Sequence, residues 1–187
     1  IQVDSSHRLD GTAYFNQSIF KADYKRLISF VAQDDIVMGK DTAREALYFS
    51  SRLRSGSSHE EATIAVEKTI AKLSIQDCAD TLLGVPGLVT GVSGGEKKRV
   101  NIGCGLINNP LILILDEPTT GLDSVNAHRV GLLLQQLARE DNRTVLCTIH
   151  SPSSELYSVF DDVLLLAKGH TVYHGPRDTA PAYFASI

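Results

Sequence analysis

Cysteine is scarce in this sequence and shows no pairing pattern. The three cysteines, Cys78, Cys104 and Cys147, form an odd set without a Cys-x-x-Cys pair, and two of them lie in apolar segments. Small thiols in such segments are commonly buried as packing residues. We therefore expect free thiols and a reducing, cytosolic compartment.

Long apolar runs and an excess of positive charge are also missing. The longest apolar stretches, 111–115 and 163–167, fall far short of the ~20 residues that cross a bilayer, so we expect no membrane span within this chain. Lys and Arg number 18 against 22 Asp and Glu, which gives a net charge of -4. This balance provides no basic field for a nucleic-acid backbone or an anionic lipid surface, and we expect no nucleic-acid partner.

The sequence has no initiator methionine and no charged leader, and it begins at Ile1 as if in the middle of a longer protein. Its composition is that of an ordinary globular protein, because 43% of the 187 residues are apolar and 21% are charged. A chain of this length predicts one domain, with room for a small inserted subdomain.

The apolar pattern predicts an α/β fold with a helical insertion. Capping boxes at Thr42/Glu45 and Ser58/Glu61 predict two successive helices, so residues of about 40–92 are expected to be mostly helical. Expected strands lie at 11–16, 27–32, 111–115, 144–149, 163–166 and 171–173, and expected helices at about 42–53, 58–73, 100–108 and 124–139. Apolar strands alternating with amphipathic helices indicate a parallel or mixed sheet covered by helices.

Ligands in such folds gather at the carboxyl ends of strands, and one expected strand ends in two carboxylates. The apolar run 111–115, expected to be buried on both faces, is followed directly by Asp116 and Glu117. This is the geometry of a Walker B strand, in which Asp116 holds Mg²⁺, usually through water, and Glu117 accepts a proton from the attacking water. For these residues alone, a solvated acidic turn before Pro118 is the alternative.

A second candidate is the start of the following helix. Ser93 and Glu96 have the spacing of a third capping box, so a well-capped helix is one interpretation. Between them lie Gly94 and Gly95, and glycine in a first turn costs up to roughly 1 kcal/mol relative to alanine. Two glycines also bare the backbone N–H groups at the positive end of the helix dipole, where a phosphate could approach closely.

Two further polar residues, Gln33 and His150, each follow an expected apolar strand. A lone histidine at a strand end is more often structural than catalytic, and a lone glutamine there is more often a surface amide. If neighbouring strands end at the same edge, however, His150 would lie beside Asp116 and Glu117, within reach of a terminal phosphate.

The order of these features resembles the nucleotide-binding domain of an ATP-binding cassette (ABC) protein over nearly all of the chain. Five motifs of that family occur here in the family order. Gln33 corresponds to the Q-loop, Val92–Glu96 to the signature motif and Leu111–Glu117 to the Walker B motif. Gly121–Asp123 corresponds to the D-loop and His150 to the switch histidine. The resemblance implies a P-loop NTPase-like mixed sheet flanked by helices, with 40–92 as an inserted α-helical subdomain and the remainder as a core α/β subdomain.

The resemblance also assigns roles and cofactors, namely ATP and Mg²⁺. Glu117 and His150 would be catalytic, and Asp116 and Gln33 would hold the metal. The nucleotide would be contacted by Gln33, Ser93, Gly94, Gly95, Glu96 and Asp123.

Longer segments resemble the White/G subfamily of these proteins, at Val31–Asp35, Thr42–Glu45, Gly91–Val100, Thr148–Ser153 and Phe160–Asp162. Two departures are Gly105, where that subfamily usually carries Glu, and Ser151, where Gln is usual. Neither position is a phosphate ligand in the family scheme, so the departures leave hydrolysis in place.

The subfamily implies a transport function. Its members are exporters of lipids, sterols or other small molecules, and the cassette lies on the cytoplasmic side of a membrane, in one polypeptide with the transmembrane domain. Three partners are expected. The first is a second nucleotide-binding domain, in a homo- or heterodimer, and the second is the transmembrane domain, which the helical insertion would contact. The third is the substrate that the transmembrane domain handles. A catalytically silent cassette and a soluble, non-transport ABC ATPase are the alternatives.

One part of the family pattern is missing, because the sequence contains no Gly-x-x-x-x-Gly-Lys-Ser/Thr phosphate loop. In the family that loop precedes the Q-loop strand, so we expect a chain cut after the loop rather than a degenerate ATPase. The presence of both Glu117 and His150 favours a truncated sequence over a degenerate ATPase. The isolated chain is then expected to be inactive, to bind ATP weakly and to leave apolar core surface uncovered.

Overall fold

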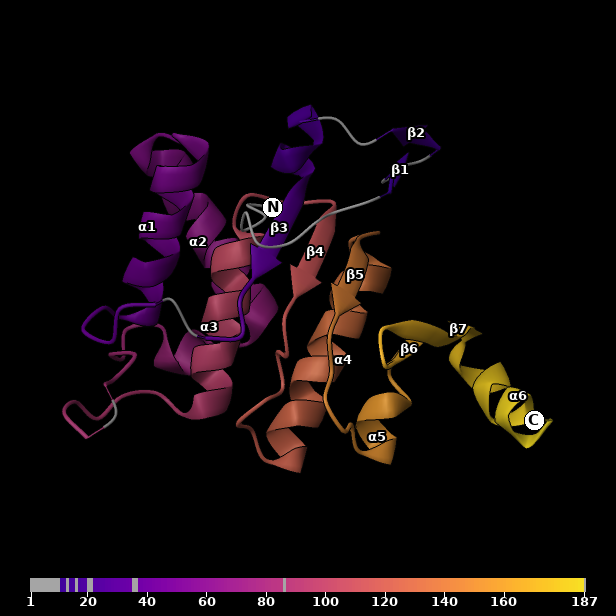
Figure 1. Cartoon of the computed structure of the whole chain (residues 1–187). Coiled ribbons are helices and arrows are strands. Elements are labelled where there is room, and N and C mark those ends of the chain that lie inside the picture. Colours follow the sequence, from indigo (N-terminus) through magenta and orange to yellow (C-terminus); the bar gives the residue numbers. More distant parts are fainter. Residues whose placement is uncertain are drawn as a thin grey trace.

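A three-stranded parallel sheet forms the centre of the fold (Figure 1). The computed structural model describes residues 11–12, 14–15, 17–19, 22–34, 37–85 and 87–186. The strand order is β3–β4–β5, where β3 spans Ile28–Val31, β4 spans Ile112–Leu115 and β5 spans Thr144–Cys147. Val31, Leu115 and Cys147 are partners in register, so the carboxyl ends of the three strands lie at one edge of the sheet.

Four long helices pack with this sheet into one core. They are α1 (Ala43–Ser55), α2 (His59–Leu73), α3 (Gly94–Leu106) and α4 (Ser124–Glu140). Helix α3 packs on β3 and also contacts α1 and α2, which lie beyond it in Figure 1, whereas α4 packs on β5. Both predicted capping boxes at the starts of α1 and α2 form, with Thr42 and Ser58 as the N-cap residues.

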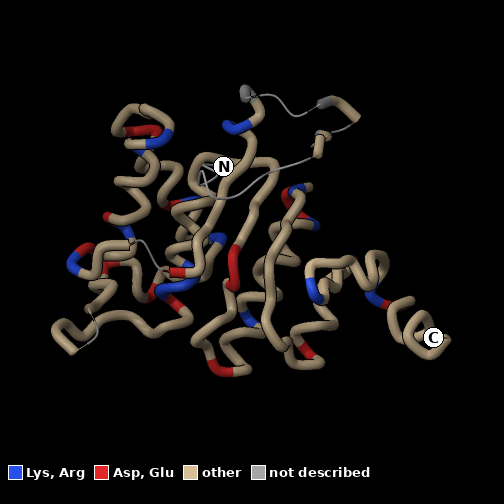
Figure 2. The backbone as a smooth tube through the Cα atoms, in the orientation of Figure 1, with Lys and Arg blue, Asp and Glu red and all other residues tan. Residues whose placement is uncertain are grey.

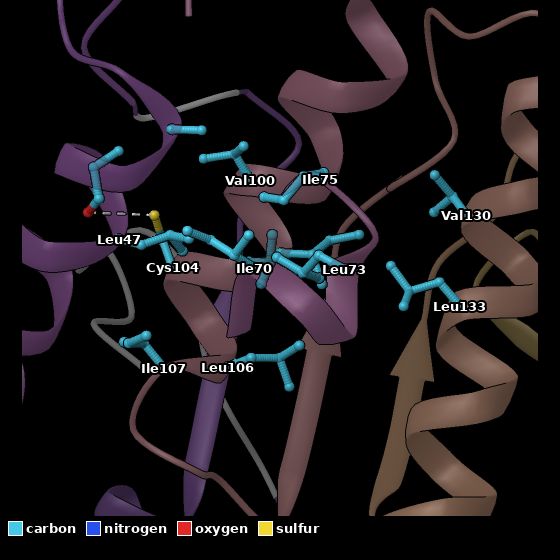
Figure 3. Close-up of a cluster of buried hydrophobic side chains, with 14 of the residues drawn as sticks. Leu47, Ile70, Leu73, Ile75, Val100, Cys104, Leu106, Ile107, Val130 and Leu133 are labelled. Carbon is cyan, nitrogen blue, oxygen red and sulfur yellow. Dashed lines mark hydrogen bonds between the residues drawn. The ribbon is translucent and has the colours of Figure 1, made fainter. Parts of the chain in front are cut away.

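The hydrophobic core lies between α3, its neighbouring helices and the sheet (Figure 3). Helix α3 approaches α1 and α2 closely at Gly103, where a Cβ atom would lie 2.8 Å from Leu47 and 2.5 Å from Leu73. At the next residue, the Cys104 thiol donates a hydrogen bond to the carbonyl of Ala46, at 3.8 Å. The absence of a side chain at residue 103 therefore sets the distance between the helices.

The predicted helical segment is shorter than expected. After α2 the chain forms only the short 3₁₀ helix η2 (Gln76–Cys78), and the described residues from 79 to 93 form a loop. In that loop the backbone of Gly84 packs against Gly39 and against Gly91. A Cβ atom on Gly39 or on Gly91 would lie 2.4 Å from a backbone atom of Gly84. Backbone contacts between glycines thus hold this part of the segment, which was expected to be mostly helical.

The central strand is also less buried than predicted. Leu113 and Leu115 are fully buried, but Ile112 and Ile114, on the opposite face, are only half-buried. On the neighbouring β5, the exposed fraction of Leu146 is 58%. The expectation of burial on both faces is therefore wrong for β4, because only the face toward α3 is fully covered by described residues.

The carboxyl-terminal part forms a separate antiparallel hairpin, of strands β6 (Asp162–Ala167) and β7 (His170–Pro176), which pair with each other. Two short helices, α5 (Ser154–Tyr157) and α6 (Ala180–Ala185), flank it, with the 3₁₀ helix η3 (Arg177–Thr179) before α6. Leu164 and Leu166 of β6 are exposed, which leaves apolar surface uncovered in the described structure.

The remaining described elements precede β3. Strands β1 (Tyr14–Phe15) and β2 (Ser18–Ile19) form a small antiparallel pair, and the 3₁₀ helix η1 (Ala22–Leu27) leads into β3. Asn16 of the predicted strand 11–16 and Asp35 lie outside the described residues. Among the described helices, none has both the length and the apolar character needed to span a membrane.

Candidate functional site

The carboxyl ends of the three parallel strands bring the predicted polar residues together. The Asp116 N–H donates to the Val31 carbonyl at 2.9 Å, and the Thr148 N–H donates to the Leu115 carbonyl at 3.0 Å. These backbone bonds extend the sheet by one residue beyond β4 and β5. Asp116 therefore lies between Gln33, which follows β3, and Thr148, which follows β5.

Glu117 is fixed by side chains from two other segments. Its Oε2 atom accepts hydrogen bonds from Gln33 Nε2 at 3.0 Å and from Thr120 Oγ1 at 2.7 Å. Within the described part of the chain, no donor contacts Oε1 of this carboxylate. One oxygen is thus anchored while the other is left to accept a proton from a bound molecule.

Thr148 joins the two carboxylate residues, and sequence reasoning missed it. Its hydroxyl donates to Asp116 Oδ1 at 2.6 Å and accepts from the Glu117 N–H at 2.9 Å. The available signal was its position directly after β5, where a parallel strand ends beside the Walker B strand.

The backbone of Glu117 adopts a left-handed conformation, with φ of 43°. A side chain other than glycine costs roughly 1–2 kcal/mol in this region. The hydrogen bonds to Gln33, Thr120 and Thr148 hold the residue there. Strained residues that are held in this way cluster at functional sites, which supports a chemical role for Glu117.

Gln33 is in turn connected to helix α3. Lys98, only 5% exposed, donates from Nζ to the Gln33 carbonyl at 2.8 Å, and Asn101 Nδ2 lies 3.5 Å from the Ala32 carbonyl. A buried ammonium group needs such partners to offset its lost hydration. Lys98 was not predicted, since in the sequence it is one of three successive basic residues whose burial has no local signal.

Ser93 caps helix α3 through the third predicted capping box. Its N–H and hydroxyl donate to Glu96 Oε2 at 2.8 and 2.7 Å, and its Oγ accepts from the Glu96 N–H at 3.3 Å. The hydrogen bond from the Ser93 side chain, followed by that from its backbone, lowers the pKa of Glu96. The well-capped helix is confirmed, and phosphate binding at this helix start stays a prediction.

Ser93→Ala should remove the cap and destabilise the chain by about 0.5–2 kcal/mol. Because the folded-state pKa of Glu96 is below its unfolded value, this cap stabilises fully above pH ~4.3 and is lost as pH falls through the depressed pKa. The stability difference between wild type and variant should therefore shrink in acid. Urea denaturation at a series of pH values measures it.

Ser58→Ala is the matched control, because Ser58 forms the same capping box with Glu61 at the start of α2. Both variants should lose similar stability, whereas only Ser93→Ala should weaken an ATP-dependent reaction of the complete protein. Equal ATP responses of the two variants would reduce Ser93 to a helix cap.

The start of α4 touches the start of α3. Asp123 caps α4 by accepting hydrogen bonds from the Val125 and Asn126 N–H groups, both at 3.0 Å, and these bonds, led by that from Asn126, lower the pKa of Asp123. A Cβ atom on Gly95 would lie 3.0 Å from Asn126 Oδ1. Gly95 thus permits the contact that places the signature segment against the D-loop segment, and Asn126 was not predicted.

His150 is placed after β5, as expected, but it is exposed, and the described hydrogen bonds of Asp116 and Glu117 go to other residues. Its proposed contact with a terminal phosphate stays a prediction.

The three cysteines are free, as expected, with Cys78 and Cys104 buried. At the end of β5, burial raises the pKa of the Cys147 thiol to about 11. A thiol that is protonated at neutral pH is a weak nucleophile, so we assign Cys147 a packing role next to the site.

The fold is that of an ATP-binding cassette, a P-loop NTPase-like α/β architecture. A solved dimer of the ATP-binding cassette MJ0796, in a post-hydrolysis state bound to ADP and Pi, matches with a TM-score of 0.69 and 24% identity. The match covers 90% of this chain and 74% of that one. The fold class expected from the sequence is confirmed.

The chain belongs to the ABC transporter family, which matches residues 5–120, and residues 150–187 match a family described as ABC-2 type transporter. ABC transporter G family member 14 of Arabidopsis thaliana is 43% identical over 97% of this chain, and the broad substrate specificity ATP-binding cassette transporter ABCG2 of Sus scrofa is 42% identical over 97%. These relatives confirm the White/G resemblance. The chain spans 28% of the length of each.

Proposed function

We propose that this chain is part of the ATP-binding and ATP-hydrolysing motor domain of a White/G-type membrane exporter. The observation that carries the proposal is the hydrogen-bonded group of Gln33, Asp116, Glu117 and Thr148 at the carboxyl edge of the parallel sheet. The edge of a parallel sheet is where ligands bind in α/β folds, and carboxylates there suit phosphate chemistry that uses a divalent cation.

The donor set fits Mg²⁺ bound together with a nucleotide. No group of three or more His, Cys, Asp or Glu residues that could hold a metal occurs among the described residues. Mg²⁺ characteristically uses one or two carboxylates and completes its shell with phosphate oxygens and water. Asp116 and the amide oxygen of Gln33 are the ligands that this chain would offer, and the bound ion would neutralise charge on the phosphates.

Glu117 would be the general base. Gln33 and Thr120 orient its carboxylate through Oε2, so that Oε1 can accept the proton of an attacking water. His150 would contact the terminal phosphate. Thr148 positions both carboxylate residues through one hydroxyl.

The remaining roles need partners. A second nucleotide-binding domain would present the segment around Ser93, Gly94 and Gly95 to a nucleotide held by this chain, and Asp123 would connect the two sites. The contact between Gly95 and Asn126 supports this connection, since it links the two segments within one chain. The upstream phosphate loop would come from a longer polypeptide.

Transport is supported by the relatives. The match of residues 150–187 to an ABC-2 type transporter family and the likeness to G family members favour a transmembrane domain in the same polypeptide over a soluble, non-transport cassette. We propose that the domain lies on the cytoplasmic side, that its helical insertion, predicted at 40–92, meets the membrane domain, and that lipids, sterols or other small molecules are exported.

Phosphate release from ATP by the complete protein in nanodiscs tests the proposal. Thr148→Val should lower the rate about tenfold, because the loss of a hydrogen bond that positions two reacting groups costs about 1–1.5 kcal/mol. Thr144→Val makes the same change at the far end of β5, where the side chain is exposed, and should leave the rate unchanged. No ATP-dependent phosphate release by the wild type would contradict the proposed function.

A further inference from the structure

A cavity of about 530 Å³ lies at the opposite end of the sheet from the candidate site. It is formed where η1 leads into β3, where α1 and α3 end, and where the chain approaches β4. The residues that give it its chemistry are Lys25, Arg26, Ser29, Arg54, Gly105 and Asn108. Its volume is within the range of small-molecule sites, which is about 300–1,000 Å³.

The charge of this cavity is positive. Lys25, Arg26 and Arg54 line it, and no acidic side chain does so among the described residues. Lys25 and Arg26 form the basic end of η1, just before β3 (Figure 2), and neither makes an ion pair with a described residue. The carboxyl ends of α1 and α3 contribute about half a negative charge each, so a net charge of about +2 is left.

Two buried polar atoms in the cavity have no hydrogen-bond partner among the residues that the structure describes. The first is Oγ of Ser29, a residue that is only 8% exposed. The Oγ atom lies 3.2 Å from the position that a Cβ atom on Gly105 would take, so the hydroxyl lies close to the backbone of α3 at the wall of the cavity. The second is Asn108 Oδ1, which likewise accepts no hydrogen bond from the described part of the chain.

Arg54 is already directed toward this space. Its Nη1 lies 3.5 Å from the carbonyl of Cys104, the residue before Gly105. Its guanidinium has further N–H groups for a ligand. The Ser29 hydroxyl can donate to an anion, and the Asn108 amide can turn to present its NH₂ group.

We propose that this cavity binds the phosphate group of a small phosphorylated molecule. Lys25, Arg26 and Arg54 balance its charge, and the Ser29 hydroxyl donates to a phosphate oxygen from the base of the cavity. The site is independent of the proposed hydrolysis, because it lies at the amino-terminal end of β3 whereas Gln33 and Glu117 lie beyond the carboxyl ends of the strands.

Calorimetric titration of the complete protein with inorganic pyrophosphate tests the site, with a non-hydrolysable ATP analogue saturating the nucleotide site. The wild type should bind pyrophosphate, and more weakly as salt is added. Arg54→Gln should lower the affinity at least about tenfold, since it removes a charge-assisted hydrogen bond. Arg52→Gln, which removes an exposed cation from the same turn of α1 outside the cavity, should bind as the wild type does.

Ser29→Ala separates a ligand role from a structural one. It should weaken pyrophosphate binding about tenfold, while thermal unfolding without pyrophosphate occurs at the same or a higher temperature, because an unpaired buried hydroxyl is removed. Wild-type affinity in both Ser29→Ala and Arg54→Gln, or no binding when the nucleotide site is filled, would overturn the proposal.

The titration in two kinds of nanodisc identifies the source of the phosphate group. Displacement of pyrophosphate by nanodiscs that contain phosphatidic acid, but not by those of phosphatidylcholine alone, would show that the cavity accepts a lipid phosphate. Equal affinity for pyrophosphate in the two kinds of nanodisc would show that the cavity binds soluble phosphorylated molecules.

Discussion

Glu117→Gln should lower phosphate release from ATP by the complete protein by a factor of about 10²–10⁴, the usual contribution of a general base. The glutamine has the same shape, and its amide oxygen can still accept from Gln33 and Thr120, which now contact Oε2. It cannot take a proton from water at neutral pH. ATP should therefore still bind, while turnover nearly stops.

Phosphate release and nucleotide binding must be measured separately on the same preparation. Glu60→Gln is a suitable control, because it makes the same chemical change at an exposed position in the first turn of α2, remote from the strand ends. It should hydrolyse ATP at the wild-type rate. Wild-type turnover in Glu117→Gln would rule out the role assigned to this carboxylate, and loss of ATP binding would assign Glu117 to binding instead.

The fold was largely predictable because its signals are local. Capping boxes at Thr42, Ser58 and Ser93 mark helix starts through side chains three residues apart, and all three form. The extent of the helical segment was overestimated, since in the loop after η2 the backbone of Gly84 packs against Gly39 and Gly91. Contacts between glycines far apart in sequence have no periodic signal.

The candidate site was predictable only in part, for a related reason. Asp116 and Glu117 follow an apolar strand directly, so their position at the sheet edge could be inferred from one segment. Thr148 and Lys98 act through partners more than thirty residues away, namely Asp116 and Gln33. Their roles depend on which strands and helices are neighbours, which composition and spacing do not specify.

The burial of β4 leads to a prediction about stability. Leu115→Ala should destabilise the chain by about 2–5 kcal/mol, because Leu115 is fully buried and its removal leaves a cavity beneath the strand. That is a large part of the roughly 5–15 kcal/mol that stabilises a typical domain. Urea denaturation followed by circular dichroism measures the change.

Leu53→Ala provides the comparison, because Leu53 lies in α1 with 84% of its surface exposed and should change stability by less than about 0.5 kcal/mol. Similar losses in both variants would show that β4 is not the packed centre of the fold. Leu115 also directly precedes Asp116, whose N–H bonds to the Val31 carbonyl of the neighbouring strand. The same cavity should therefore loosen the two carboxylate residues, so that phosphate release falls even at temperatures where Leu115→Ala stays folded.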